Sequence, residues 1–384
     1  MVSPVRIALL YPQSEFFPRL KDELRFALSL GLQFAGYHQP VEWQPEFINS
    51  ADIKSVEQAI KKAIYHLESQ LIIVVANTKT VVELTSLYEQ STLPVIVLNL
   101  GANLPAVHWN SPFLFYNSLH SWKAQWALGK WAQQQYGGIC AVNTTLYEGG
   151  YLLHEAFRLG LGAAGAASLY LNVAKNFGKQ FDTSSLFQQM QQQDVSHVHA
   201  VLSGNEGQHF LDTYKQTPAI NEKPLTVNAF MVDETVVPAN AAMHDAVFAS
   251  TWYSSLDNDA NHQFVAHFSA AKKKMPSAFG LLGYETGLAL GIALQTAEDI
   301  DGEVLADALS NSQPIGPRGA VSLSTSPLQA DMQVHILKAT FDEGAKSLQH
   351  HKIAEGEHIS WQSECIAASA AAAVAGWQNP YLFT

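Results

Sequence analysis

Uncharged hydrogen-bonding side chains gather in three short segments, 12–17, 77–80 and 99–103, and each segment directly follows an apolar run. Hydroxyl, amide and backbone N–H groups of this kind can hold a carboxylate or an amide. Thr78 and Thr80 precede or open an expected helix, whose free N–H groups suit an anion. The Thr78 hydroxyl could equally be only the N-cap of that helix, and one group can serve both purposes. The candidate binding residues, chosen as polar or aromatic groups in such loops, are Tyr11, Gln13, Ser14, Asn77, Thr78, Thr80, Asn99, Tyr116, Tyr147, Asn205, Trp252 and Tyr253.

One string in the sequence has the form of a nucleotide-binding motif, G-x-G-x-x-G at 160–165. A dinucleotide site needs this string between a strand and a helix N-terminus, where amides meet the pyrophosphate. Here it follows an expected helix at 151–161, so we interpret it as a helix C-cap and turn. The sequence contains neither a G-x-x-x-x-G-K-[ST] loop nor a G-x-S-x-G elbow. We therefore expect no cofactor.

Histidine and cysteine supply no catalytic or metal-binding set. His197 with His199, and His350 with His351, have no metal-ligand motif around them, which favours solvated or hydrogen-bonded histidines. Cys140 lies in an apolar segment and is expected to be an inert core thiol. Without a nucleophile–base pair or a ligand set, we expect neither a metal nor catalysis.

Composition narrows the class of protein further. The chain has 384 residues, enough for two or three domain-sized units, and 47% of them are hydrophobic, so a packed core is expected. With 22 Lys and Arg against 34 Asp and Glu, the net charge of −12 argues against a nucleic-acid partner. No segment is long and apolar enough to span a bilayer stably. The two cysteines, Cys140 and Cys365, are too few for a disulfide framework, and the sequence does not tell whether they pair.

Short apolar runs alternate with amphipathic segments, a pattern that predicts an α/β fold with parallel sheets and helices on both faces. Ligands of such sheets bind beyond the carboxyl ends of the strands, where the three polar segments lie. The pattern restarts near 122, so a second α/β unit of similar size is expected, and 334–341 with 349–354 is expected to form a strand pair. Expected strands are 5–11, 42–47, 71–76, 94–98, 138–143, 167–173, 199–202 and 225–230, and expected helices are 19–34, 53–67, 80–90, 122–135, 151–161, 183–193, 208–217, 261–276 and 283–297.

Six segments in the right order resemble the type I periplasmic binding proteins of the branched-chain amino acid and amide group, which are receptors of ABC transporters. The likeness extends over nearly the whole chain, and the joint order of the segments is more specific than any one of them. The segments are VRIALLYPQSEFF, LIIVVANTKTVVELTSLYEQSTLPVIVLNLGA, SPFLFYNSLHSWKAQWALGKWA, VLSGNEGQHFLDTY, NHQFVAHFSAAKKKMPSAFGLLGYETGLALGIALQTAED and PIGPRGAVSLS.

The resemblance implies two Rossmann-like lobes joined by a three-crossover hinge, with a small-molecule ligand trapped between them by hinge closure. It implies an N-terminal lobe of 1–117 with about 252–328, and a C-terminal lobe of 118–251 with about 329–384. It further implies a permease as partner, a periplasmic location and no catalysis. Matched position by position, it implies ligand contacts from Thr78, Thr80, the loop of Asn99 and Gly101, Tyr147, Glu148, Asn205 and Glu206.

The sequence departs from the family pattern at two places. The usual Ser-Gly-Pro opening is replaced by Gln13-Ser14-Glu15, with two phenylalanines after it. Where amino-acid binders carry an acidic anchor for the ammonium group, the chain has Met231 and Val232, with Asp233 slightly beyond. A buried unpaired ammonium would be costly, so we expect a small carboxylate, an amide or an aromatic acid before an ordinary α-amino acid. An amino-acid-like ligand stays open if the loop turns Asp233 into the cleft.

Two other functions remain open at the level of sequence. The N-terminus has no basic segment followed by an apolar one, so either a signal peptide has been removed or the protein is cytoplasmic. A cytoplasmic ligand sensor of the same fold would suit the second case. An α/β enzyme is the third reading, disfavoured because no catalytic set is visible.

Overall fold

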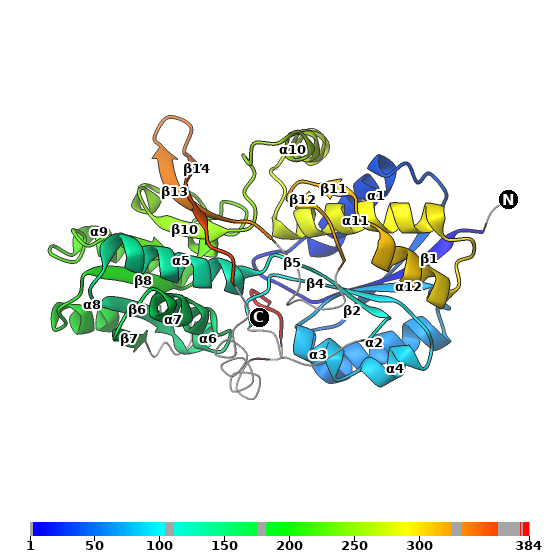
Figure 1. Ribbon diagram of the computed structural model, residues 1–384, viewed down its shortest axis with the longest axis horizontal. Coiled ribbons are helices and arrows are strands. Elements are labelled where there is room, and N and C mark those ends of the chain that lie inside the picture. Colours follow the sequence, from blue (N-terminus) through cyan, green and yellow to red (C-terminus); the bar gives the residue numbers. More distant parts are fainter. Residues whose placement is uncertain are drawn as a thin grey trace.

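Two α/β lobes lie side by side along the long axis of the molecule, each built around its own sheet (Figure 1). The computed structural model describes residues 3–103, 111–174, 182–323, 332–359, 377 and 379–383. The predicted α/β class with two lobes and parallel sheets is confirmed. Within the described residues, no helix has the length and hydropathy needed to cross a bilayer.

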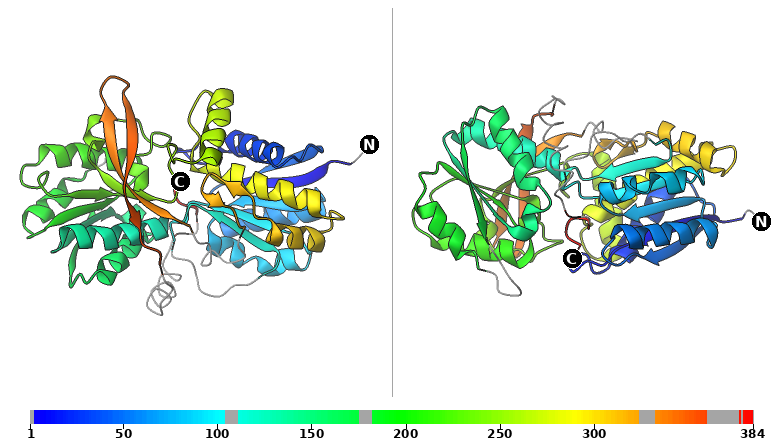
Figure 2. Two further views of the ribbon diagram at one scale, coloured as in Figure 1. Left: turned by 45° about the horizontal axis from the view of Figure 1, so that its top comes forward. Right: turned by 90° about the horizontal axis from the view of Figure 1, so that it is seen from below.

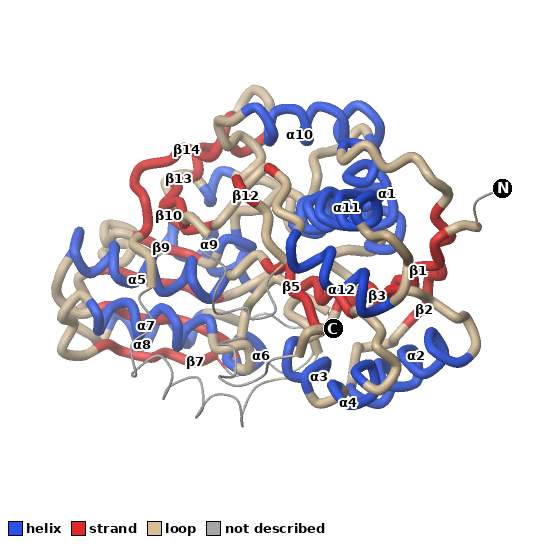
Figure 3. The backbone as a smooth tube through the Cα atoms, turned by 45° about the vertical axis from the view of Figure 1, so that its right-hand side comes forward, coloured by secondary structure: helices blue, strands red, loops and turns tan. Residues whose placement is uncertain are grey.

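The first lobe is built on a parallel sheet with the strand order β2-β1-β3-β4-β5. Successive residues of a strand face opposite sides of a sheet. Helices α1, α11 and α12 lie on one side of the sheet and α2 to α4 on the other (Figure 3). Ile7 and Leu9 accordingly pack against the first group, whereas Ala8 and Leu10 pack against the second. The elements are β1 Val5–Tyr11, α1 Leu20–Phe34, β2 Val41–Phe47, α2 Ile53–Tyr65, β3 Leu71–Val75, α3 Thr78–Val82, α4 Thr85–Glu89, β4 Val95–Asn99, β5 Leu114–Ser118, α10 Asp259–Lys272, α11 Ala278–Thr296 and α12 Gly302–Asn311.

The second lobe has the strand order β14-β13-β10-β9-β8-β6-β7, parallel except that β13 is antiparallel to both of its neighbours. Helices α5 and α7 cover one face of this sheet, and α8 and α9 cover the other. The β13–β14 hairpin projects from the lobe (Figure 2). The elements are α5 Ser121–Tyr136, β6 Cys140–Thr145, α6 Leu146–Gly149, α7 Leu153–Ala163, β7 Leu169–Ala174, α8 Ser184–Gln191, β8 His197–Val201, α9 Gly204–Gln216, β9 Leu225–Val227, β10 Val247–Ser250, β13 Val334–Asp342 and β14 Ser347–Gly356, with a small ribbon of β11 Ile315–Gly316 and β12 Gly319–Ala320 after α12.

Glycines in two helix pairs let the helix backbones touch. A Cβ on Gly31 of α1 would lie 2.2 Å from the Tyr284 carbonyl oxygen of α11, and one on Gly160 of α7 would lie 2.0 Å from the Trp126 carbonyl oxygen of α5. Contacts that short are impossible, so only glycine permits this packing. Gly160 begins the G-x-G-x-x-G string, which ends in the turn after α7 at Gly165, with φ +89°. The string therefore ends α7, as predicted, and its first glycine also packs α7 against α5.

Several element boundaries differ from the sequence-based expectation. The expected helix 80–90 is two short helices, α3 and α4, and it begins at Thr78. Helix α9 begins at Gly204 rather than at 208, which turns most of an expected loop into the first helical turn. The strand expected at 225–230 ends at Val227 and is followed by a 3₁₀ turn. The third crossover beyond Leu328 and the partner of Cys140 in a possible disulfide, Cys365, lie partly or wholly outside the described residues.

A buried ion pair lies where the chain passes between the lobes. The Arg318 guanidinium meets the Glu285 carboxylate of α11 at 2.5 Å, with the two side chains 2% and 0% exposed. The guanidinium also donates to the carbonyl oxygen of Ser118 (2.8 Å) and to the Thr251 hydroxyl (3.4 Å), which belong to the first and second crossovers. One side chain thus links α11 to two crossovers, from a position near the third.

Removing one member of this pair should be costly, because the other would remain buried without its counter-charge. We expect Glu285→Gln and Arg318→Met each to lower the free energy of unfolding by about 3–5 kcal/mol in urea titrations. The matched control is Glu343→Gln, which breaks the pair with Lys346 where both side chains are exposed, 70% for Lys346 and 72% for Glu343. Its expected effect is below about 1 kcal/mol. Losses of equal size in the buried and exposed pairs would contradict the role given to Arg318.

Candidate functional site

Asn99 organises the polar loops at the carboxyl edge of the first-lobe sheet. Its side-chain amide donates to the Thr78 hydroxyl at 3.0 Å, and its Oδ1 accepts from the backbone N–H of Gly101 at 3.0 Å and from Ser118 Oγ at 2.8 Å. Gly101 has φ +65°, and a Cβ there would lie 2.5 Å from Ser118 Oγ. Three of the predicted site residues are therefore brought together, with Asn99 between the other two.

The N-cap of α3 is Asn77 rather than Thr78. The Asn77 side chain accepts from the backbone N–H of Lys79 at 3.0 Å, which is the usual capping geometry. Thr78 is the first residue of the helix, and its hydroxyl accepts from Asn99. Because that hydroxyl is not used for capping, its own proton is available for another acceptor. The capping role considered for Thr78 is wrong, and the hydroxyl keeps the role of a ligand donor as a prediction.

The second lobe presents carboxylates from α6, which follows β6 directly, and from the start of α9. Glu148 is fully buried, and its Oε1 accepts a hydrogen bond from Ser203. Glu206 is half-buried and accepts from the Thr145 hydroxyl at 3.0 Å. The Glu148 Oε2 atom meets no described donor in hydrogen-bonding geometry, although the Tyr381 hydroxyl lies near enough to influence the carboxyl.

Burial raises the pKa of Glu148 to about 7. The nearby Glu206 charge acts in the same direction, whereas the hydrogen bond from Ser203 and the nearby Tyr381 hydroxyl favour the charged form and limit the rise. A carboxyl with this pKa is partly protonated near neutral pH, so it can donate as well as accept a hydrogen bond. The Glu148 carboxyl of the second lobe can therefore form a hydrogen bond with a hydroxyl or an amide.

An aromatic ring of the chain itself lies between these two sets of residues. Tyr381 is 3% exposed, its hydroxyl accepts from Asn228 Nδ2 at 2.6 Å, and its ring centroid lies 4.8 Å from that of Tyr151 and 5.7 Å from that of Phe230. In both views of Figure 2 the end of the chain lies between the lobes. The last residues were expected to belong to the C-terminal lobe, so residues 379–383 depart from that expectation.

A pocket of about 20 Å³ remains between Tyr381 and the first-lobe loops, with Asn77, Thr78, Asn99 and Gly101 in its lining. Such a volume holds about one water molecule. The predicted carboxylate-binding loops therefore do face a shared pocket. Pro380 and Tyr381, near the end of the chain, also line it.

Other predicted site residues lie elsewhere. Tyr116 points into the core between the first-lobe sheet and α2 to α4, which corrects its placement in the cleft, and Thr80 is buried within α3. The side chains of Gln13 and Asn205 are exposed. Trp252 is held in the second crossover by a hydrogen bond from its indole N–H to Asn261 Oδ1 at 2.8 Å.

Sequence reasoning chose the wrong residue after β9 and missed the residues that surround Tyr381. Met231 and Val232 are buried in the second-lobe core, and the residue that faces the cleft is Phe230. An apolar side chain was expected to face the cleft after β9, and one does, but it is Phe230 rather than Met231 or Val232. A 3₁₀ turn at 229–231 sets which side chain faces outward, and no sequence pattern marks that turn.

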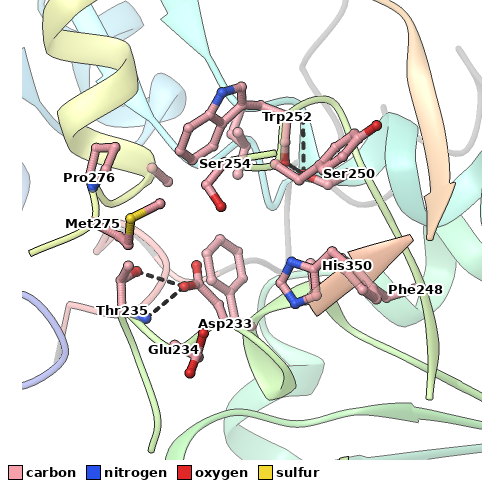
Figure 4. A pocket seen from close by; sticks show the side chains of 15 residues that line it. Asp233, Glu234, Thr235, Phe248, Ser250, Trp252, Ser254, Met275, Pro276 and His350 are labelled. Carbon is pink, nitrogen blue, oxygen red and sulfur yellow. Dashed lines mark hydrogen bonds between the residues drawn. The ribbon is translucent and has the colours of Figure 1, made fainter. Parts of the chain in front are cut away.

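A second cavity of about 90 Å³ lies between the crossovers and the loop after β9 (Figure 4). Asp233, Trp252, Met275 and His350 are among the side chains that line it. The Asp233 carboxylate accepts from the N–H and the hydroxyl of Thr235 at 2.8 and 2.7 Å, and burial raises its pKa. Asp233 therefore faces this cavity rather than the small pocket beside Tyr381.

The histidines do not form a metal site in the described part of the chain, where no group of three or more potential ligands is present. His197 and His199 are fully buried in β8 rather than solvated. His199 makes a hydrogen bond with the Thr226 hydroxyl at 3.0 Å and stacks on Phe157. Burial lowers the pKa of both histidines, so they are neutral core residues.

Comparison with known proteins identifies the family of this fold. A family model described as "Periplasmic binding protein" matches residues 49–345. No curated protein matches the sequence. Among solved structures, an ABC transporter substrate-binding protein from Sphaerobacter thermophilus is 20% identical, with a TM-score of 0.77 over 92% of this chain and 98% of that chain.

Two further solved structures share the fold and carry ligands. An ABC transporter solute-binding protein from R. palustris in complex with benzoate is 18% identical, with a TM-score of 0.73 over 94% of this chain and 99% of that chain. The second structure is the branched-chain amino acid transporter substrate-binding protein from Streptococcus pneumoniae in complex with isoleucine. It is 11% identical, with a TM-score of 0.67 over 91% of this chain and 100% of that chain. At these identities the likeness shows the fold alone.

The raised pKa of Glu148 predicts a specific pH dependence of stability. Because the pKa in the folded protein, about 7, exceeds the ordinary value of 4.5, the protonated carboxyl stabilises the fold at low pH and this stability is lost as the pH rises through 7. Between about pH 5.5 and about pH 8 the loss should be roughly 2 kcal/mol. Urea titrations should show that Glu148→Gln lacks this part of the pH dependence. Parallel pH profiles of the two proteins would contradict it.

Proposed function

Because the chain belongs to the periplasmic binding protein family, we propose that it is the substrate-binding component of an ABC transporter and lies in the periplasm. Its ligand is a small carboxylic acid or amide with an apolar or aromatic body, which it delivers to a permease. One observation carries the ligand class. The position between the lobes is lined by neutral donors from the first lobe and aromatic rings from the second, and an aromatic side chain with a hydroxyl, Tyr381, fits it.

Thr78, Asn99 and Gly101 are suited to hold a carboxylate or an amide oxygen. The Asn99 side chain fixes the Thr78 hydroxyl and the Gly101 loop through hydrogen bonds of 3.0 Å each. Donors fixed in this way lose little conformational entropy when a ligand binds. The ligand would thus be oriented by a few hydrogen bonds at its polar end.

Tyr151 and Phe230 are suited to hold the apolar body. Aromatic rings bury large apolar areas and prefer tilted contacts, as both make with Tyr381, at 60° and 68°. Phe230 faces the cleft after β9, where an ammonium group would need an acidic partner. Glu148 and Glu206 are the remaining candidates for such a partner. Burial disfavours the charged form of Glu148, and Glu206 already accepts from the Thr145 hydroxyl. These features support a ligand without an ammonium group.

The solved relatives are consistent with this range of ligands. The R. palustris protein is in complex with an aromatic carboxylate, benzoate, and the Streptococcus pneumoniae protein is in complex with an amino acid, isoleucine. The fold therefore accommodates both chemical classes. The choice for this chain rests on its own residues.

A thermal-shift screen over aromatic carboxylates, amides and amino acids tests the proposal. A ligand at ~100 times its Kd should stabilise the protein by ~2.7 kcal/mol. Solution scattering with a hit at saturation should then show a smaller radius of gyration at unchanged mass, as hinge closure requires. No stabilisation by any member of the panel, or an unchanged scattering profile with a bound ligand, would count against a transport receptor.

The ammonium group provides a sharper test, with 3-phenylpropanoate and L-phenylalanine as a matched pair. We expect the des-amino acid to bind at least about tenfold more tightly in calorimetry, a difference of ~1.4 kcal/mol. The reason is that an ammonium beside Phe230 would be buried without an anion. Tighter binding of L-phenylalanine by the same factor would reverse the proposal and make Glu148 or Glu206 the ammonium anchor.

Thr78→Val tests the polar end of the site. The substitution keeps the shape of the side chain and removes its hydroxyl, so binding of the best carboxylate should weaken by roughly 1–3 kcal/mol. The control is Asp52→Ala, which removes the N-cap of α2 outside the pocket lining and should cost stability of ~1 kcal/mol while leaving the affinity unchanged. If Thr78→Val leaves the affinity unchanged, the carboxylate is held elsewhere.

A further inference from the structure

We propose that the C-terminal residues 379–383 are a built-in occupant of the ligand site between the lobes, so that a solute binds only by displacing them. This inference rests on the proposed function, because it names the regulation of the same site. The occupant is a short peptide of this chain, Asn-Pro-Tyr-Leu-Phe, and its contacts reach residues of both lobes.

The first lobe holds the segment through the loop after β1. Ser14 Oγ donates to the carbonyl oxygen of Leu382 at 2.5 Å and accepts from the backbone N–H groups of Phe16 and Phe17 at 3.1 Å each. The ring of Phe383 stacks on Phe17 at 5.9 Å between centroids. The loop after β1, which was expected to contact a solute, therefore binds the main chain of Leu382 and the ring of Phe383.

The second lobe holds the segment through its polar and aromatic groups. Asn228 donates to the Tyr381 hydroxyl at 2.6 Å, and Asn379 Nδ2 donates to the Tyr151 hydroxyl at 2.8 Å. The Tyr381 hydroxyl also lies beside the Glu148 carboxyl. Tyr381, by its ring and its hydroxyl, thus makes the contacts that a hydroxylated aromatic solute would make.

Occupation and solute binding exclude each other because Tyr381 lines the pocket at Thr78, Asn99 and Gly101 and packs on the rings of Tyr151 and Phe230. With the segment in place, the pocket at Thr78, Asn99 and Gly101 has about 20 Å³, room for about one water molecule. Leu382 and Phe383 are 0% exposed, so the segment is buried rather than laid over the entrance. The room beside Thr78, Asn99 and Gly101 is therefore too small for a solute of the proposed class while Tyr381 remains.

The segment is built to be displaceable. The hydrogen bonds described here between 379–383 and the two lobes join neutral groups, with no ion pair among them, and a solute can replace each of them. The apparent affinity of a solute is then its intrinsic affinity multiplied by the fraction of molecules in which the segment is not seated.

The experiment uses the full chain and a peptide probe. Tyr381→Ala with Phe383→Ala removes the two aromatic anchors while the chain keeps its full length. We expect the N-acetylated, C-amidated peptide of residues 379–383 to bind this double variant at least about tenfold more tightly in calorimetry than the unmodified protein, whose own segment competes.

Two controls give the comparison its meaning. Ile353→Ala removes an exposed apolar side chain of β14, 43% exposed, and should bind the peptide as weakly as the unmodified protein. A peptide with alanine at the tyrosine and phenylalanine positions should bind no variant. Equal binding of the original peptide to all three proteins, or no binding to the double variant, would overturn the proposal.

Hydrogen–deuterium exchange on the unmodified chain gives an answer even if the double variant does not fold. The backbone N–H of Phe383 bonds to the carbonyl oxygen of Pro380 at 3.1 Å in a buried position, so amides of 379–383 should exchange more than about tenfold more slowly than in the free peptide. Exchange at the free-peptide rate would refute the seated segment.

The proposal and the proposed function fail in different ways. If the peptide behaves as expected but no member of the acid, amide and amino-acid panel binds the double variant, the segment is a true occupant and the solute class is wrong. If an aromatic acid binds the unmodified protein and the double variant with equal affinity, solute binding stands and competition by the segment falls.

Discussion

The buried pair of Arg318 and Glu285 is the constraint on which the two-lobe arrangement depends. A guanidinium has five donors in a fixed plane, and here they reach the Glu285 carboxylate, the Asn117 side chain at 2.8 Å and the Ser118 carbonyl oxygen at 2.8 Å. The desolvation of both charges is offset only because these partners are present together. An apolar pair of similar volume could fill the space, but it could not hold two crossovers by directed hydrogen bonds.

Hydrogen bonds connect the Arg318–Glu285 pair to the proposed ligand site through Ser118 and Asn99. Ser118 accepts from Arg318 with its carbonyl oxygen and donates with its hydroxyl to Asn99, and Asn99 in turn donates to the Thr78 hydroxyl. Gly101 lies so close to Ser118 that it has no room for a side chain. The donors proposed for the ligand are therefore fixed relative to the crossovers, so a change in the hinge and a change in the pocket act on one contiguous set of hydrogen bonds.

The sequence predicts those parts of the fold that periodicity controls. Apolar runs such as 71–75 and 95–99 are strands because both faces of the sheet are covered, and the polar loops follow them at the expected edge. The sequence is less decisive where two neighbouring residues could both cap a helix. Asn77 and Thr78 are both capping residues, and the helix begins one residue after Asn77. Contacts of long sequence separation leave no pattern at all, as with Ser14 and Leu382, which are 368 residues apart.

The energetics of residues 379–383 explain how a buried segment can still leave the cleft. Burying the side chains of Tyr381, Leu382 and Phe383 contributes about 1.5–3 kcal/mol each, roughly 5–9 kcal/mol together. Ordering five residues costs about 1–2 kcal/mol each, roughly 5–10 kcal/mol. Leu382 also has φ +66°, a left-handed conformation that costs about 1–2 kcal/mol for a residue with a side chain. The terms nearly cancel, so the few hydrogen bonds to Ser14 and Asn228 decide whether the segment is seated. A solute at ~100 times its Kd contributes ~2.7 kcal/mol, which is enough to compete with an occupant held by so small a difference.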